Sequence, residues 1–312
     1  MTKSNPKIVL ALSTYNGEKF LAQQLDSLLA QSYDNFIILV RDDGSKDKTF
    51  SLLQAYAAEY PDRFHLIEQD GVNRGARGGF SFLIEYALEK KADLGLEQAY
   101  IMFCDQDDIW NPDKVERQLA AMVEAEQGST SSLPILVHSD LQVVSEQNTP
   151  IAKSFIKYQG LQIEDKQFKN LTASNLVTGC TALINESLAR KAIPISDKAI
   201  MHDWWLAMVA TAFGQLIFLD LALVRYRQHD GNTIGAKQYV ALTSSSTTIF
   251  SRLFRQKPSV HLHSVSIQAK AFLGSYGSEL GFRKRFSLSL AIILRSNSRI
   301  IQRIVYRLLR MS

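Results

Sequence analysis

At residues 100–108 the chain reads Tyr100-Ile101-Met102-Phe103-Cys104-Asp105-Gln106-Asp107-Asp108, an apolar run followed by three carboxylates. The apolar run has the length and composition of a buried strand, so the carboxylates should emerge together at its carboxyl end. Open α/β sheets bind ligands outside that end of their strands. Like charges this crowded repel unless a cation lies among them, and oxygen ligands suit Mg²⁺ or Mn²⁺, which usually bind jointly with phosphates. The run therefore predicts an α/β fold with a metal–diphosphate site.

Two other interpretations of this acidic cluster compete with the metal site. One is a solvated acidic turn that caps the helix expected after Pro112, and the tetrapeptide alone leaves it open. The other is a calcium loop, because Asp105, Asp107 and Glu116 occupy positions 1, 3 and 12 of an EF-hand frame. Trp110 stands where that loop needs glycine, and a strand precedes the cluster, so the calcium loop is rejected.

The composition is that of an ordinary globular enzyme. The 312 residues are 46% hydrophobic and 21% charged, which suits one large α/β domain or a domain with an appendage. Cys104 and Cys180 form neither a metal-binding spacing nor a disulfide framework, which fits a reducing compartment. The polar start from Met1 to Lys7 predicts no secretory signal, and no apolar stretch is long enough to span a bilayer.

Strands and helices are expected to alternate through the first half of the chain. Apolar runs at 8–12, 36–40, 64–67 and 100–104 predict strands, and the segments 20–29, 48–60 and about 79–91 between them predict helices. This alternation predicts a mostly parallel sheet wound with right-handed crossovers. Residues 135–184 are more strand-like and less regular, and a helix around 203–213 and a strand around 216–226 complete the catalytic unit. The low-complexity stretch 243–248 predicts a mobile loop.

Polar clusters follow three of these strands and should lie side by side as one pocket. They are Thr14-Tyr15-Asn16, Asp42-Asp43 and Asp105 through Asp108. A carboxylate such as Asp42 can accept hydrogen bonds from a base or a ribose, and Tyr15 can pack on a base. A simple turn at Asp43 and ordinary packing of Tyr15 remain open alternatives. Further along, Asn73, Gly75 and Arg77 precede a helix amino terminus suited to anions, although their spacing is no dinucleotide fingerprint.

Together these stretches resemble the glycosyltransferase family 2 enzymes, which have the GT-A fold. The resemblance covers about the first 230 residues, and its motifs are 12–17, 41–45, 73–75 and 103–110. It implies a nucleotide-sugar donor, a Mg²⁺ or Mn²⁺ ion, and inversion at the anomeric carbon. Carried over by position, it implies that Asp105 contacts the ribose and that Asp107 binds the metal. The remaining residues of the implied nucleotide-sugar site are Thr14, Tyr15, Asn16, Asp42, Asp43, Asn73 and Arg77.

The resemblance also implies a general base, and Asp203 in Met201-His202-Asp203-Trp204-Trp205 stands in its place. The chemistry needs a carboxylate that takes the proton of the attacking acceptor hydroxyl. The alternative for Asp203 is a helix cap. His202 departs from the commonest motif, which has Glu there, and we do not expect His202 to act as a base.

Four more residues are expected on the acceptor side, and one more at the metal. Trp204 and Trp205 are expected to form a stacking surface for a sugar, with buried core as the alternative. Gly179 and Cys180 resemble the family segment that lines the acceptor, the glycine permitting close approach of a ligand. His229, after the last core strand, is expected near the diphosphate or the metal, with a loop histidine as the alternative.

Within the family, the motifs at 103–110 and 202–205 look most like bacterial rhamnosyltransferases of cell-wall and capsule assembly. This likeness implies transfer of L-rhamnose from dTDP-β-L-rhamnose to a saccharide acceptor that is lipid-linked, giving an α-L-rhamnoside. Transfer of glucose or galactose from a UDP-sugar is the alternative. More remote ones are a sugar nucleotidyltransferase, which should carry a glycine-rich basic loop after its first strand, and a non-catalytic nucleotide-sugar-binding module.

The chain is expected to divide into a catalytic domain, 1–230, and a basic helical extension, 231–312. The net charge is +4, yet residues 281–312 carry eight basic and no acidic side chains; subtracting them leaves the rest near −4, so no nucleic-acid partner is predicted. Residues 295–310 predict a helix with arginines on one side and apolar residues on another, namely Ile301, Ile304, Val305, Leu308 and Leu309. We expect it to attach a cytoplasmic protein to the inner face of the membrane. The alternative is a helix packed on the catalytic domain or on a second subunit of a homo-oligomer.

Overall fold

The computed structural model describes residues 5–128, 133–165, 167–229 and 260–310, so the loop predicted at 243–248 lies outside the described residues. In this part of the chain, nine strands form one sheet in the order β3-β2-β1-β4-β8-β6-β9-β5, and β7 pairs with β6. The strands are β1 (Ile8–Thr14), β2 (Phe36–Asp42), β3 (Phe64–Leu66), β4 (Tyr100–Cys104), β5 (Ile109–Trp110), β6 (Ile135–Val144), β7 (Pro150–Ala152), β8 (Ala182–Ile184) and β9 (Gln215–Arg227).

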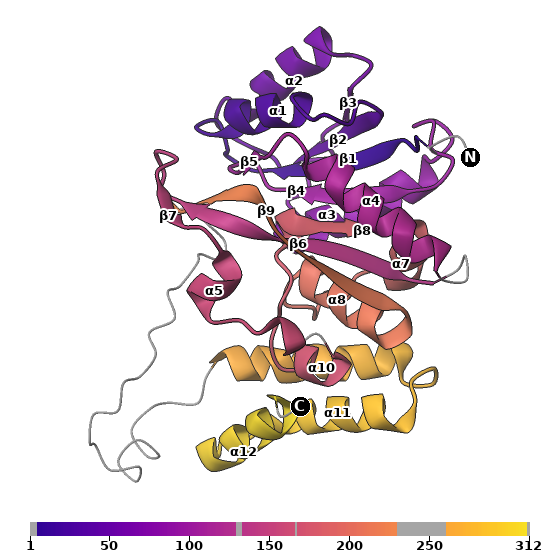
Figure 1. The fold of residues 1–312 in the computed structure, drawn as a ribbon, viewed down its shortest axis with the longest axis vertical. Coiled ribbons are helices and arrows are strands. Elements are labelled where there is room, and N and C mark those ends of the chain that lie inside the picture. Colours follow the sequence, from indigo (N-terminus) through magenta and orange to yellow (C-terminus); the bar gives the residue numbers. More distant parts are fainter. Residues whose placement is uncertain (1–4, 129–132, 166, 230–259, 311–312) are drawn as a thin grey trace.

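Helices separate most of the strands and cover both faces of the sheet (Figure 1). Short 3₁₀ turns lie at Ile163–Asp165 and Gly179–Thr181. The α-helices are α1 (Leu21–Leu29), α2 (Thr49–Glu59), α3 (Gly75–Glu89), α4 (Lys114–Gln127), α5 (Phe155–Gln159), α6 (Phe168–Leu171), α7 (Glu186–Ala192), α8 (His202–Phe213), α10 (Val260–Tyr276), α11 (Phe282–Ile293) and α12 (Arg299–Arg310).

The central strands are apolar throughout because both of their faces are buried. On β1, Val9 and Ala11 belong to a hydrophobic cluster that includes residues of α3, α7 and α8. The alternating residues Ile8, Leu10 and Leu12 belong to a second cluster, which includes residues of α1 and α4. A strand between two helical layers needs apolar side chains in both directions, and this explains the unbroken apolar runs in the sequence.

The first half of the sheet is parallel, as predicted, and the second half is mixed. Strand β1 pairs in parallel with β2 and β4, and β2 pairs in parallel with β3. Strand β8 is antiparallel to β4 and β6, whereas β6 and β9 are parallel to each other. The end of β9 also pairs antiparallel with β5, so Ile109 lies opposite Arg225. This last pairing brings the segment after the acidic cluster to the end of β9.

The polar strand ends lie at one edge of the sheet. The register of β1 with β2 places Thr14 beside Asp42, and its register with β4 places Leu12 beside Cys104. The residues that follow these three strands therefore emerge next to one another, which confirms the predicted common position of the clusters.

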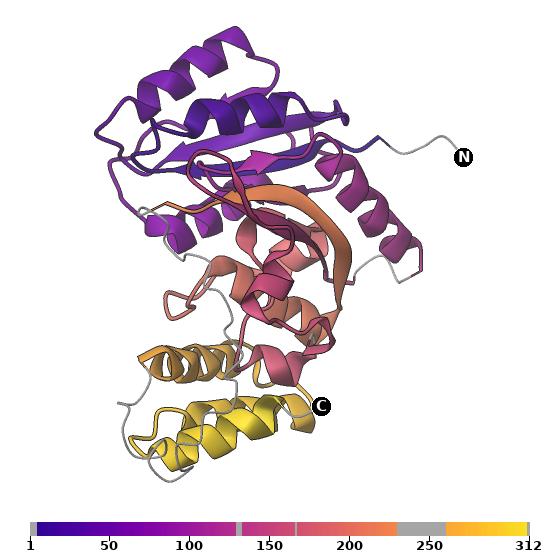
Figure 2. The same cartoon turned by 60° about the vertical axis from the view of Figure 1, so that its left-hand side comes forward.

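The carboxyl-terminal region is helical, as predicted, and it packs on the rest of the protein. Helices α10, α11 and α12 lie beyond α8 at one end of the molecule, opposite the end that carries α2 (Figures 1 and 2). The ring of Phe272 on α10 contacts Trp205 of α8 and Phe168 of α6, with centroid separations of 5.1 and 5.7 Å. None of the helices in the described ranges combines the length and hydrophobicity that crossing a membrane requires.

The apolar residues predicted to share one exposed face of α12 are divided between a buried side and an exposed side. Val305 and Leu309 are buried, as is Gln302, whose side-chain amide donates to the carbonyls of Leu294 and Ser296 at 3.0 Å each. This side of α12 therefore closes on α11 and α6. Ile301, Ile304 and Leu308 of the predicted set stay exposed, together with Ile300.

Candidate active site

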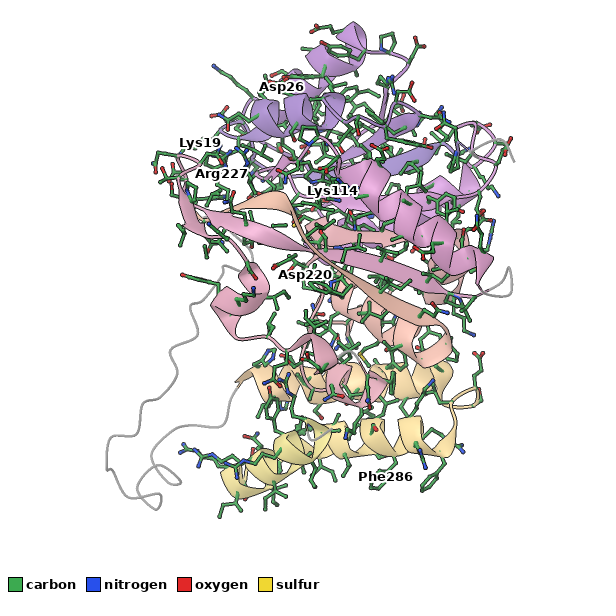
Figure 3. All side chains as sticks on the ribbon, in the orientation of Figure 1. Lys19, Asp26, Lys114, Asp220, Arg227 and Phe286 are labelled. Atoms are coloured by element: carbon green, nitrogen blue, oxygen red, sulfur yellow. The ribbon has the colours of Figure 1, made fainter. Side chains whose placement is uncertain are left out.

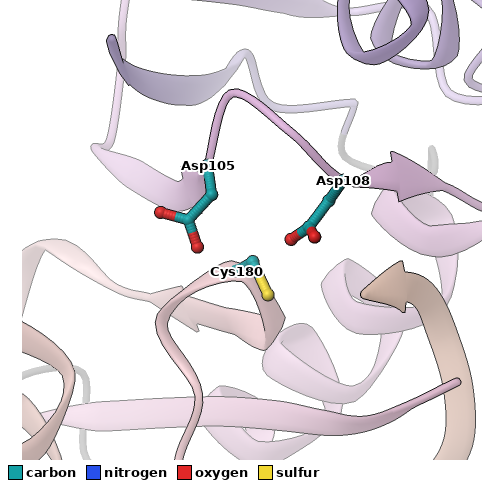
Figure 4. Close-up of side chains that lie close together, drawn as sticks. All are labelled: Asp105, Asp108 and Cys180. Carbon is teal, nitrogen blue, oxygen red and sulfur yellow. The ribbon is translucent and has the colours of Figure 1, made fainter. Parts of the chain in front are cut away.

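The acidic cluster occupies the short loop between β4 and β5. Asp105 and Asp107 are partly exposed, whereas Asp108 is buried. One oxygen of Asp108, Oδ1, accepts a hydrogen bond from the backbone N–H of Arg227 (3.2 Å), and the other, Oδ2, is buried without a hydrogen-bond partner among the described residues. Ligand atoms of Asp105, Asp108 and Cys180 all lie within 4.8 Å of one another (Figure 4).

Asp203 and the acidic loop approach the same turn: a Cβ at Gly179 would lie 3.7 Å from Oδ2 of Asp203, and Cys180 lies beside Asp105 and Asp108. Burial, together with the charges of Asp107 and Asp203, raises the pKa of Asp105 to about 7. Burial and the charges of Asp107 and Asp105 raise the pKa of Asp108 well above its usual range. Burial also raises the pKa of the Cys180 thiol, which keeps it protonated and a poor metal ligand. The clustering therefore disfavours the ionised forms of these carboxyl groups, and a bound cation would relieve the repulsion between them.

The donor set of the loop fits a hard divalent cation. The Asp107 carboxylate lies 2.8 Å from Nε2 of His229, so the two residues expected at the metal are brought together. The Asp108 carboxyl adds a buried oxygen beside the Cys180 thiol. Carboxylates supplemented by one imidazole suit Mg²⁺ or Mn²⁺.

Side-chain hydrogen bonds connect the loop after β1 to the loop after β2. The Thr14 hydroxyl donates to Asp42 Oδ1 (2.9 Å), and Asp42 also accepts from the backbone N–H of Ser45 and from the Gln69 amide, at 2.9 and 2.6 Å. Asn16 has a left-handed backbone (φ 49°), and its side-chain oxygen accepts from the backbone N–H of Lys46 (2.8 Å). Asp42 and Thr14 are buried, so both shape these loops through their mutual hydrogen bonds.

Gln106 links the loop after β1 to the acidic loop, and the sequence analysis did not give it a role. Its side-chain oxygen accepts from the backbone N–H of Tyr15 (2.8 Å), and its amide donates to the Tyr15 carbonyl (3.0 Å). A Cβ at position 17 would lie 2.3 Å from Oε1 of Gln106, so Gly17 leaves room for this pairing. The Tyr15 side chain remains 46% exposed, which leaves it able to meet a base.

The structure places Asp43 differently from the predicted nucleotide contact. Asp43 and Arg41 form an ion pair whose side chains are each only 4% exposed. The Asp43 carboxylate also accepts hydrogen bonds from the backbone N–H groups of Arg74 (2.8 Å) and Gly75 (2.7 Å), at the start of α3. Asn73 donates to the Asp43 carbonyl (2.9 Å). Asp43 therefore fixes the amino terminus of α3, because unpaired N–H groups there favour a carboxylate.

Arg77 reaches across the pocket from α3. Its guanidinium donates to the carbonyl of Ala199 (2.8 Å), in the segment that leads into α8. The predicted nucleotide-side residue therefore touches the segment that carries the predicted base.

Asp203 lies in the first turn of α8 and is 8% exposed. The N-cap of this helix is Met201, so the capping alternative does not describe Asp203. Its Oδ1 accepts from the side-chain amide of Asn175 (3.2 Å) and from the backbone N–H of Trp204 (2.5 Å). Burial raises the pKa of Asp203 to about 7, a value suited to a group that takes up a proton at neutral pH. Asn175 begins the segment 175–184, which was expected on the acceptor side, but its contact with Asp203 was not predicted from the sequence.

His202 belongs to the core beneath the site. Its ring packs on Phe80 and Phe103, with centroid separations of 4.1 and 5.0 Å, and burial lowers its pKa to about 3. A Cβ at position 179 would lie 2.8 Å from Nε2 of His202. The missing side chain of Gly179 therefore makes room for this imidazole, and the approach of a ligand there stays a prediction. Cys180 is likewise buried.

The predicted stacking surface of Trp204 and Trp205 is not present. Both side chains are buried, with 3% and 1% exposed. Their indole N–H groups donate to the backbone carbonyls of Leu171 (2.6 Å) and Ala192 (3.3 Å). The two rings hold α8 against α6, α7 and α10, so the buried-core alternative describes them.

Arg227, at the end of β9, supports the acidic loop from the other side. Its guanidinium donates to the backbone carbonyls of Asp107 (2.9 Å) and Glu146 (2.6 Å) and to the side chain of Gln23 (2.7 Å). These bonds join β9, α1 and the turn between β6 and β7, and Figure 3 shows Arg227 at this junction near Lys19. Because it is charged and buried, Arg227 needs all of these acceptors.

A wound sheet with helices on both faces, and with clustered carboxylates at the strand ends, is the arrangement of a nucleotide-sugar transferase. The family model described as glycosyl transferase family 2 matches residues 10–190. The chain belongs to this family. Among curated relatives, the dTDP-rhamnosyl transferase RfbG of Shigella flexneri is 28% identical over 72% of this chain and 74% of its own length. An uncharacterized glycosyltransferase of Rickettsia typhi is 24% identical over 92% of this chain and 85% of its own.

Solved structures share the GT-A fold, as the sequence predicted. The chain superimposes on residues 1–349 of TarS from S. aureus in complex with UDP-GlcNAc with a TM-score of 0.57 and 13% identity, covering 96% of this chain and 90% of that one. Against the longer TarS chain the match covers 42% of that chain. The mannosyltransferase PcManGT from Pyrobaculum calidifontis, in complex with GDP-Man and Mn²⁺, gives a TM-score of 0.54 at 14% identity, covering 98% of this chain and 86% of that one.

Proposed function

We propose that this glycosyltransferase is a metal-dependent, inverting enzyme that transfers L-rhamnose from dTDP-β-L-rhamnose to a saccharide acceptor. The observation that carries the mechanism is that Asp105 and Asp203 lie beside the same turn: ligand atoms of Asp105 and Cys180 are within 4.8 Å of each other, and a Cβ at Gly179 would lie 3.7 Å from Oδ2 of Asp203. Membership of family 2 supports a nucleotide-sugar as the donor substrate. The pocket thus offers a metal-binding side and a proton-accepting side to the same substrates.

Asp203 acts as the general base. Its carboxylate takes the proton of an acceptor hydroxyl while that oxygen attacks the anomeric carbon of the donor. The new glycosidic C–O bond forms on the face opposite the bond to the diphosphate, which breaks and releases the nucleoside diphosphate. One displacement of this kind inverts the configuration, so a β-linked L-rhamnosyl donor gives an α-L-rhamnoside. Asn175 holds the carboxylate through its 3.2 Å hydrogen bond.

Asp105, Asp107 and His229 are the residues that would hold the cation. A bound Mg²⁺ or Mn²⁺ would neutralise the charge that develops on the departing diphosphate. Tyr15 would lie against the base, since its aromatic side chain is exposed at the first strand end.

The choice of rhamnose is supported by the similarity to RfbG and by the motifs at 103–110 and 202–205. The experiment is a donor-hydrolysis panel with dTDP-β-L-rhamnose, UDP-glucose, UDP-galactose, UDP-GlcNAc and GDP-mannose, each with Mn²⁺. We expect the highest turnover with dTDP-β-L-rhamnose. Preferred hydrolysis of UDP-glucose or UDP-galactose would assign the enzyme to hexosyl transfer from UDP-sugars instead.

A saccharide acceptor bound to a lipid is proposed for the transfer step. The test supplies the preferred donor together with a bacterial lipid extract, and the product anomer is determined by NMR. An α-linked product from the β-linked donor supports inversion, whereas a β-linked product would contradict it. Donor hydrolysis without transfer to any fraction would favour an acceptor that is not lipid-linked.

A further inference from the structure

Helices α11 and α12 expose an apolar surface at one end of the molecule. Of thirteen exposed large hydrophobic residues in the described part of the chain, seven belong to these two helices. On α11 they recur at intervals of four and seven, so they share one side of the helix. They are Phe282, Phe286, Ile293, Ile300, Ile301, Ile304 and Leu308, and Figure 3 shows Phe286 at the end of the molecule farthest from the sheet.

The two helices pack on the protein with one side, and this apolar surface lies on their other, exposed sides. Leu288, Ala291 and Leu294 of α11 and Val305 and Leu309 of α12 are buried in a hydrophobic cluster shared with α8 and α10. The exposed set lies on the remaining sides of the same helices. Phe282 is 76% exposed, an unusual position for a phenylalanine unless it serves contact with something else.

The same segment is strongly basic. Residues 281–310 carry eight Lys and Arg side chains and no Asp or Glu. Four of the arginines are exposed among the apolar residues, namely Arg283, Arg285, Arg295 and Arg307. Apolar side chains interspersed with positive charge, and without any negative charge, match the interface of an anionic bilayer.

We propose that the α11–α12 surface, defined by these seven apolar and four basic residues, docks on an anionic lipid bilayer. The apolar side chains enter the headgroup boundary, and the arginines pair with lipid phosphates. A second copy of the chain fits this surface poorly, because its charge would face an identical positive charge across a dry interface. A neutral apolar partner would leave the concentration of arginines without a counterpart.

The residues proposed to contact the lipid are not the same as those expected from the sequence. Val305 and Leu309 face the protein, whereas Phe282, Phe286 and Ile293 of α11 join the contact. Removing the chain from Gly281 onward would also remove Leu288, Ala291, Leu294, Val305 and Leu309 from the hydrophobic cluster and would confound docking with unfolding. Point substitutions on the exposed surface avoid this problem.

The test is co-sedimentation of the full-length protein with two kinds of vesicle, phosphatidylcholine alone and phosphatidylcholine mixed equally with phosphatidylglycerol. We expect binding to the anionic vesicles only, and weaker binding as salt is added. The double variant Phe286→Ser with Ile304→Ser should weaken binding about tenfold or more, since burial of each side chain is lost. The double variant Arg285→Gln with Arg295→Gln should weaken it and reduce its salt dependence.

The matched control is Ile151→Ser with Leu221→Ser, which alters equally exposed apolar residues on β7 and β9. It should bind vesicles as the unmodified protein does. All variants should retain the melting temperature and the donor hydrolysis of the unmodified protein, since none of these residues lies in the site. Binding of the surface variants at full strength, equal binding to both vesicles, or no binding at all would overturn the proposal. A dimer in solution that the Phe286→Ser, Ile304→Ser variant abolishes would assign the surface to a second copy instead.

Discussion

The pKa of one carboxyl, that of Asp203, sets the expected pH dependence of transfer. Burial raises this pKa to about 7, and a general base must be unprotonated to accept the acceptor's proton. The rate should therefore be low at acid pH and rise to a plateau above pH 7, with its midpoint near that value. The measurement is kcat/KM on both sides of the midpoint, because this ratio reports the pKa of the free enzyme.

Asp203→Asn supplies the companion measurement. It should lower kcat by about 10²–10⁴. Donor affinity, measured by calorimetry, should change little because the strand-end residues are untouched. A flat pH profile, or an Asn variant that transfers sugar at the normal rate, would place the base elsewhere.

Asn175 should influence the midpoint of the pH–rate profile of transfer without contacting the substrate. Its amide donates to Asp203 and helps to lower the pKa of that carboxyl. Asn175→Ala should therefore move the midpoint of the pH–rate profile to higher pH, with donor affinity unchanged. Ser174→Ala, one residue earlier in the same loop, is the control and should leave the midpoint in place. A loss of rate with an unmoved midpoint would show that Asn175 supports the fold only.

Substitution of Asp43 tests whether its carboxylate stabilises the fold or binds the nucleotide. Asp43→Ala would leave the buried Arg41 with Asp70 at 3.2 Å as its remaining carboxylate and with the Val72 carbonyl at 2.6 Å, and would release the start of α3. We expect the free energy of unfolding to fall by about 3 kcal/mol, because the remaining charge is buried without its main partner. Chemical denaturation measures this, with the exposed Asp62→Ala as control. An unchanged stability together with a large loss of nucleotide affinity would restore the predicted role.

At the scale of the elements, local patterns predicted the parallel half of the sheet and its helices. Runs such as 36–40 carry their own periodicity, and β2 indeed spans Phe36–Asp42. Strands β5 and β8 have only two and three residues and acquire their structure from distant neighbours, as when Ile109 pairs with Arg225. Such pairings are non-local, so no window of sequence contains them.

The site shows the same contrast between features that local sequence patterns predict and features that depend on non-local contacts. The acidic cluster was predicted because its polar side chains follow an apolar strand, whereas Asp203 was assigned as the base only through the resemblance to the family motif. Gln106 and Arg227 were not predicted, because their roles lie in bonds to the backbone of Tyr15 and Asp107. The two tryptophans were misplaced although a signal existed: α8 is apolar all around, which predicts a buried helix rather than one with a sugar-binding side.

The loop between β4 and β5 should bind the metal through Asp107. Mn²⁺ added with dTDP should raise the melting temperature of the unmodified protein, because the ion neutralises clustered carboxylates and joins them to the diphosphate. Asp107→Ala should remove this increase and abolish transfer while leaving the melting temperature without ligands close to normal. Asp113→Ala, an exposed acid just beyond the loop, should behave like the unmodified protein. Full activity in excess EDTA would contradict the metal site.

At the scale of the whole molecule, the carboxyl-terminal helices are part of the core that holds Asp203, the proposed base. Trp205, two residues after Asp203, packs on Phe272 and Tyr276 of α10. Helix α8 thus touches the pocket at its amino terminus and the extension along its length. The boundary drawn near residue 230 separates segments of the chain, but the hydrophobic cluster continues across it.

This continuity predicts a single cooperative unfolding transition. Phe272→Ala removes a fully buried ring between α6, α8 and α10 and should lower the stability of the entire protein by about 3–5 kcal/mol. Thermal unfolding followed by circular dichroism and by residual donor hydrolysis should give one shared midpoint, displaced equally for both probes. Ile267→Ala, on the exposed side of the same helix, should leave that midpoint nearly unchanged. If the variant instead melts in two steps, with hydrolysis surviving the first, the extension folds independently and does not support the position of Asp203.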